Sequence, residues 1–206
     1  MRKILLLLLL LLATSSLAEP PAYLHIVSDK QIGPVKKSST WQSIINTVGS
    51  AYVEEGEVYV GEGVSVPATI VYPGHPNRTL KVIWKEGPRS SATPDSVWLS
   101  GSDTEWTTPD RITLGTGLSR LEKVNGGPFK LHGFEWDFGG LVTRWNGKLE
   151  NRFKGMSVRL ALPPKGDFEE PDFEAMSGIL GDVEIGSDHP YFLGVDPVID
   201  QIVVSF

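Results

Sequence analysis

The sequence predicts an α+β fold of two tandem units, each a short helix packed on an antiparallel β-sheet. A capped helical segment occurs twice, eighty positions apart, and each copy is followed by two strand segments joined by a short turn and then by a third strand. Because the strands come in hairpins and do not alternate regularly with helices, we expect antiparallel sheets. One mixed α+β domain without a true duplication is the open alternative. We therefore divide the chain into a signal peptide at 1–18, a first unit at 22–100, a linker at 101–110 and a second unit at 111–206.

The N-terminus has the features of a secretory signal peptide. Arg2 and Lys3 precede nine consecutive apolar residues at 4–12, and small residues follow up to Ala18. The apolar run is about half of the roughly 18 residues that a membrane-spanning helix needs. We therefore expect cleavage after Ala18 and a periplasmic or secreted protein with no membrane span.

Charge and cysteine content exclude several function classes. The 206 residues carry a formal net charge of −6, and loss of the leader with its two basic residues takes this to −8. Phosphate backbones would repel such a chain, so we expect no nucleic-acid partner. The chain has no cysteine, which excludes disulfides, thiol nucleophiles and cysteine-ligated zinc, and leaves burial alone to stabilise the fold.

Both helices are predicted from capping boxes followed by apolar residues at helical spacing. Residues 39–42 (Ser-Thr-Trp-Gln) open the first helix, which runs to Gly49. Residues 119–122 (Ser-Arg-Leu-Glu) open the second, which runs to Gly126. Each Ser side chain is expected to accept a hydrogen bond from a free amide of the first turn.

The strands of the first unit are predicted at 69–72 and 79–85, joined by a turn at 73–77, with a third at 96–100 around Trp98. The acidic stretch 53–62 alternates like a polar edge strand, where charge discourages association between sheet edges.

In the second unit, 134–138 and 141–145 flank Gly139-Gly140 and predict a β-hairpin. A third strand follows at 156–162, and the β-prone run 198–206 is expected to hold the chain end in a sheet.

The predicted hairpin register places Glu135 and Asp137 on one face with Arg144 between them. Two carboxylates on one face are typical of a glycosidase, but an adjacent guanidinium would lower both pKa values and remove the protonated acid that this chemistry needs. We therefore expect an ion-paired surface there and no catalytic residue. The opposite face carries Trp136 and other aromatic residues, as core or, alternatively, as a platform for stacking sugars.

No cofactor or metal site is expected. The four histidines are isolated in the sequence, and the acidic stretch 167–174 lacks the spacing of a calcium loop. Loose cation binding at 167–174 remains an open alternative.

Residues 112–129, followed by 133–140, resemble a segment of uncharacterised exported bacterial proteins. A looser resemblance covers most of the chain. The pattern of an apolar lead-in, a short capped helix and antiparallel strands occurs twice, and it is similar to the α+β modules of the β-lactamase-inhibitory-protein and outer-membrane-assembly lipoprotein (BamE-like) type. Members of those groups bind proteins and are not enzymes, which the resemblance implies here.

The expected function is therefore that of a non-enzymatic exported protein that binds a protein partner in the cell envelope. One alternative is a carbohydrate- or small-ligand-binding module that uses exposed tryptophans, and another is a hydrolase with a site assembled from distant residues. The candidate binding residues are Trp98, Trp106, Trp136, Glu135, Asp137 and Arg144.

Overall fold

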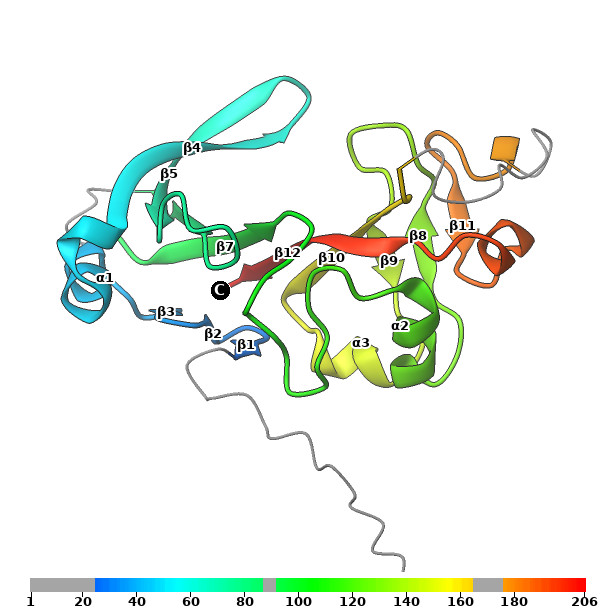
Figure 1. Cartoon of the computed structure of the whole chain (residues 1–206), viewed down its shortest axis with the longest axis horizontal. Helices are drawn as coiled ribbons and strands as arrows, with labels where there is room; N and C mark the ends of the chain where they lie inside the picture. The colour runs from blue at the N-terminus through cyan, green and yellow to red at the C-terminus, as the bar shows by residue number, and fades with distance from the viewer. Residues whose placement is uncertain (1–24, 87–91, 165–175) are drawn as a thin grey trace, which may run out of the picture.

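The computed structural model describes residues 25–86, 92–164 and 176–206, and in these ranges the chain is mostly β-structure (Figure 1). Twelve strands form three antiparallel sheets, accompanied by three short α-helices. The predicted tandem helix-on-sheet α+β arrangement is therefore wrong. The signal peptide at 1–18 and the acidic stretch 167–174 lie outside the described residues.

The main sheet has six strands, and it combines strands from both predicted units. Its order is β10 (Met156–Ala161), β12 (Val198–Ser205), β7 (Pro94–Ser100), β6 (Leu80–Trp84), β5 (Val64–Val71) and β4 (Val53–Gly61). The C-terminal strand β12 hydrogen bonds to β10 on one side and to β7 on the other. Because β12 is paired along both of its edges, the two predicted units contribute strands to one sheet.

The two faces of the main sheet differ in burial. A row of neighbouring residues, one from each of four strands, lies in the core: Val82, Val97, Val204 and Met156. The adjacent row across the same strands is half-buried or exposed. One face therefore packs on the core and the other stays open, as antiparallel sheets commonly allow.

The remaining elements cover the core side and the ends of the main sheet. One small sheet consists of β1 (Ile26–Val27), β2 (Gln31–Ile32) and β3 (Val35–Lys36), and the other of β11 (Glu184–Gly186), β8 (Lys130–His132) and β9 (Val142–Arg144). The helices are α1 (Trp41–Val48), α2 (Leu118–Asn125), α3 (Lys148–Arg152) and the short 3-10 turns η2 (Ser50–Tyr52) and η3 (Pro190–Leu193).

Helix α1 is confirmed, but its capping box lies one residue later than predicted. Thr40 is the N-cap: its hydroxyl accepts from the Ser43 amide at 3.2 Å, and the Ser43 hydroxyl accepts from the Thr40 amide at 2.8 Å. Ser39 instead accepts from the amide of Lys36.

Helix α2 is confirmed and ends as predicted at Gly126 in the left-handed conformation, but its predicted capping box does not form. The amide and hydroxyl of Ser119 both donate to the carboxylate of Asp196, each at 2.9 Å. Glu122 accepts from the hydroxyl of Ser187. A carboxylate distant in sequence therefore replaces the local cap.

The predicted hairpin at 134–145 is wrong, because β9 pairs with β8 and residues 133–141 form the loop between them. Within this loop the amide of Phe134 donates to Ile179 O at 2.7 Å. Gly140 lies against β10, where a side chain would collide with the carbonyl of Leu160. The glycine is thus required for a close approach to the main sheet and not for a two-residue turn.

The other strand predictions are confirmed. The predicted strands 69–72, 79–85, 96–100 and 156–162 fall on β5, β6, β7 and β10. The acidic stretch 53–62 contains β4, which is an edge strand of the main sheet, and the run 198–206 contains β12. None of the helices in the described part of the chain has the length and hydropathy that a membrane crossing requires.

Candidate functional site

A groove of about 380 Å³ lies on the open face of the main sheet, and we call it the sheet groove. It is lined by residues of the sheet, of the β4–β5 hairpin and of the loop 133–141. These residues are Val58, Tyr59, Val60, Gly61, Lys81, Trp98, Ser100, Asp137, Phe138, Leu141, Ser157, Arg159, Gln201 and Val203.

The roof of the sheet groove is the outer part of the β4–β5 hairpin, residues 56–68, which we call the arm. Strand β5 pairs with β6 only from Thr69 to Val71, so the arm projects beyond the other strands (Figure 1). At its base, a Cβ on Gly56 would lie 2.7 Å from Cγ1 of Ile70, so only glycine allows this close approach. Val58 lines the groove and is 2% exposed although it belongs to a projecting hairpin. The arm therefore folds over the open face.

The tip of the arm is fastened to the loop 133–141. The carboxylate of Asp137 accepts from the Glu62 amide at 3.0 Å and from the Tyr59 hydroxyl at 3.4 Å. The ring of Phe138 packs beside Gly61. The same loop continues to Leu141, which forms a β-bridge with Arg159 of β10. These contacts connect the two edges of the main sheet across its open face.

The floor of the sheet groove is a row of neighbouring side chains from four strands. Lys81 lies opposite Trp98, Trp98 opposite Val203, and Val203 opposite Ser157. The indole Nε1 of Trp98 donates to the Ser96 hydroxyl at 3.1 Å, two residues back along β7. The ring therefore lies along its strand, half-buried, and faces the groove.

The charged side chains of the sheet groove differ in how they are paired. The guanidinium of Arg159 makes two parallel contacts to Asp200, at 3.0 and 2.7 Å. The carboxylate of Asp137 accepts hydrogen bonds from the Glu62 amide and the Tyr59 hydroxyl of the arm. In the described part of the chain the ammonium of Lys81 pairs with no carboxylate. Among the described residues, Lys81 and Asp137 are therefore the groove charges without an oppositely charged partner, and hydrogen bonds from the arm hold the Asp137 carboxylate at the arm tip.

Of the six residues predicted as binding residues, the structure brings Trp98 and Asp137 to the sheet groove. Trp106 is 2% exposed and belongs to the core. Glu135 is exposed outside the groove, on a left-handed backbone with a φ of 65°. Trp136 is half-buried beside His132 and Phe138, and its Nε1 donates to Gly133 O at 2.9 Å.

The predicted ion pairing of Arg144 is wrong. Since β9 pairs with β8 and β8 with β11, Arg144 lies near Glu184 and contacts its carboxylate at 2.5 Å. The hydrogen bond from Thr143 is the main cause that holds the pKa of Glu184 below its usual value, and the hydrogen bond from Arg144 is the second. Neither Glu135 nor Asp137 takes part in this ion pair.

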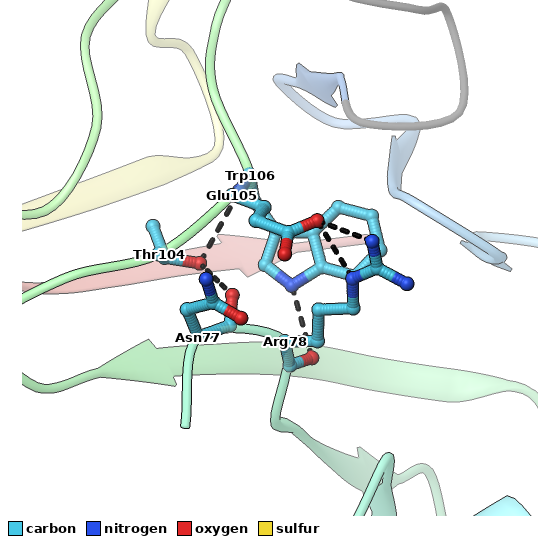
Figure 2. Close-up of polar contacts among 5 residues, drawn as sticks. All are labelled: Asn77, Arg78, Thr104, Glu105 and Trp106. Atoms are coloured by element: carbon cyan, nitrogen blue, oxygen red, sulfur yellow. Dashed lines mark hydrogen bonds and ion pairs between the residues drawn. The ribbon is translucent and has the colours of Figure 1, made fainter. Parts of the chain in front are cut away.

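Figure 2 shows why Trp106 is structural. Its Nε1 donates to Arg78 O at 3.0 Å, and its amide donates to the Thr104 hydroxyl at 3.2 Å. Asn77 O accepts from the amide of Glu105 at 2.9 Å, while Arg78 and Glu105 form an ion pair at 2.5 Å. This network fastens residues 104–106 to the turn before β6.

Sequence reasoning missed Lys81, Ser157 and Gln201 as groove residues. The alternation of β6 does place Lys81 on the face opposite Leu80 and Val82, but it cannot reveal which strands flank it. Among the described residues, no group of three or more His, Asp or Glu side chains is arranged to hold a metal ion.

No protein-family model matches the chain, and no curated protein matches it. Among solved structures it is similar to the uncharacterized protein yfeY from Escherichia coli, with a TM-score of 0.46 and 16% identity over 87% of this chain and 99% of that one. A likeness of this size carries no functional argument. The resemblance to β-lactamase-inhibitory-protein and BamE-like modules stays a prediction.

Proposed function

We propose that the chain is a non-enzymatic exported binding protein whose sheet groove holds a small ligand, such as a sugar ring, against Trp98. The observation that carries this proposal is the half-buried indole on the floor of a groove that the arm roofs. A volume of about 380 Å³ falls within the range of small-molecule sites.

The chemistry of the lining suits a ligand with an apolar face and polar edges. Trp98 offers a flat ring, and Val58 and Leu141 add apolar surface. Ser100 and Gln201 supply hydroxyl and amide groups that both donate and accept hydrogen bonds. Sugar rings and small amphipathic molecules need this combination.

The state of Asp137 favours binding over turnover. Among the described residues that line the groove, Asp137 is the only acidic one. Both of its carboxylate oxygens accept hydrogen bonds from the arm. A carboxylate committed in this way holds structure in place and is poorly suited to proton transfer.

The test is a fluorescence titration of the full-length protein with a panel of mono- and oligosaccharides and small aromatic compounds. We expect a saturable change in tryptophan emission that Trp98→Phe abolishes. The matched control Trp84→Phe changes a half-buried tryptophan outside the groove and should keep the response. A response that survives Trp98→Phe would refute binding at the groove.

A second candidate function is binding of a protein partner in the cell envelope through the arm tip. Tyr59, Val64 and Phe138 are 54%, 51% and 39% exposed. Tyr59 and Val64 lie near the arm tip, and Phe138 of the loop 133–141 packs beside Gly61. Exposed aromatic and aliphatic side chains gathered at one place mark interaction surfaces.

Site-specific photo-crosslinking tests this second function. A photoreactive side chain at position 64 should give one adduct with an envelope protein fraction, whereas the same group at exposed position 37 should not. Unlabelled protein should compete for that adduct, and the double variant Tyr59→Ser/Phe138→Ser should not. Equal labelling from both positions would argue against a partner at the arm tip.

A further inference from the structure

We infer that the ligand of the sheet groove carries an anionic group, and that Lys81 binds this group beside Trp98. This inference rests on the proposed function and names the class of ligand. It follows from the position of Lys81, from the state of its charged neighbours and from the polar groups around it.

The position of Lys81 is fixed by the register of the main sheet. It lies directly opposite Trp98, and side chains in such pairs have Cβ atoms about 4.5–5.5 Å apart. Its neighbour on the other side is Ile70 of β5, an apolar residue. A ring stacked on Trp98 would therefore have the ammonium within reach of its edge.

The charge on Lys81 lacks a counter-ion within the described part of the chain. Arg159 is neutralised by its two contacts with Asp200, and the carboxylate of Asp137 is turned to the arm. Lys81 is itself half-buried and lines the groove. Such a charge favours an opposite charge nearby, and screening by salt is weaker there than on an open surface.

The next row across the floor can complete an anion site. Ser100 and Gln201 are paired in register and both line the groove. A hydroxyl and an amide donate to carboxylate or phosphate oxygens, and hydrogen bonds to a charged acceptor are stronger than those to a neutral one. The ligand class is therefore a small ring bearing a carboxylate or a phosphate.

The experiment titrates two matched sets of probes into the full-length protein. One set is glucose, glucuronate and glucose 6-phosphate, and the other is benzyl alcohol, benzoate and phenyl phosphate. Within each set the ring is shared and the charge changes. The readout is Trp98-dependent fluorescence, as defined by its loss in Trp98→Phe.

We expect at least one acidic probe to bind about tenfold more tightly than its neutral counterpart. Lys81→Gln should weaken the binding of acidic probes by about tenfold and leave the binding of neutral probes unchanged. The control Lys85→Gln removes an exposed lysine next to the same strand. It should change the affinity for neither the acidic nor the neutral probes. The preferred acid distinguishes a carboxylate from a phosphate ligand.

Two negative results have different meanings. If neutral and acidic probes bind equally and Lys81→Gln has no effect, the anionic ligand is refuted and the proposed function stands. If no probe of either charge gives a Trp98-dependent response at millimolar concentration, the proposed function is wrong and the inference falls with it. Thermal unfolding of each variant shows whether it keeps the fold.

Discussion

Asn125, a single buried side chain at the end of α2, joins three segments of the chain. Its Nδ2 donates to Gly127 O at 2.9 Å and to Trp145 O at 2.7 Å, and its Oδ1 accepts from the Leu149 amide at 3.1 Å. Leu149 lies in the first turn of α3, whose N-cap Gly147 has no side chain to offer. Asn125 therefore caps α3 from a neighbouring helix.

We predict that Asn125→Ala lowers the free energy of unfolding by about 2–4 kcal/mol. Asn125 is 1% exposed, so its removal leaves buried partners without hydrogen bonds, each at a cost of about 1–3 kcal/mol. Urea unfolding measures the change. Asn151→Ala, at an exposed position of α3, is the control and should stay within about 0.5 kcal/mol of the wild type. A similarly small effect of Asn125→Ala would contradict the assignment.

Glu105 makes the stability of the network in Figure 2 depend on pH. The hydrogen bond from Arg78 is the main cause that holds the pKa of Glu105 below its usual value. A folded-state pKa below the unfolded one contributes stability that is present above the unfolded pKa, about 4.3. That contribution is lost as the pH falls through the lower, folded-state pKa.

We therefore predict that Glu105→Gln is less stable than the wild type near neutral pH and that the difference shrinks below about pH 4. Thermal unfolding of both proteins across this range measures it. Glu86→Gln, at an exposed position, should track the wild type. A difference that is constant with pH would show that the ion pair does not carry the effect.

The arm is connected to the rest of the molecule at its base and at its tip. At its base β5 pairs with β6 over three residues, and at its tip the fastening depends on Asp137 and Phe138, which are both exposed. Segments held by exposed hydrogen bonds open locally at low free-energy cost. Access to the sheet groove therefore depends on the tip contacts.

We predict that Asp137→Ala speeds hydrogen exchange at the amide of Glu62 by about two- to tenfold, because an exposed hydrogen bond contributes about 0.5–1.5 kcal/mol. The free energy of global unfolding should fall by no more than this same amount. Glu135→Ala removes an acid from the same loop without touching the arm and serves as the control. Equal exchange rates in both variants would mean that Asp137 does not fasten the tip.

The sequence predicts single elements better than it predicts their partners. The alternation of apolar residues is a local property, so it identifies the central residues of β6 and β7. Helical spacing identifies α1 for the same reason. The cap of α2 comes from Asp196, which no pattern within 119–122 can reveal. Likewise Phe134 alternates like a strand residue, but its backbone bonds to Ile179 and not to the facing hairpin strand. Trp98 could be singled out as an aromatic residue in a strand, whereas the groove around it depends on pairings distant in sequence.

At the scale of the whole molecule, β12 decides how many folding units there are. Ile202 is fully buried and is paired in register with Leu99 of β7 and Val158 of β10, which are also buried. One side chain thus packs between strands from both predicted units. The main sheet should therefore unfold as one cooperative unit, since loss of β12 leaves β7 and β10 with newly exposed edges and apolar faces.

We predict that Ile202→Ala destabilises the protein by about 2–5 kcal/mol through loss of buried contacts and a residual cavity. Because the sheet is shared, the slowest-exchanging amides of β6 and of β10 should lose the same amount of protection in hydrogen exchange. Val183→Ala, at a position that is 43% exposed, is the matched control and should leave both sets unchanged. Selective loss in β10 with β6 unaffected would mean that the halves fold independently despite their common sheet, and equal loss in both would establish β12 as the strand that makes them one unit.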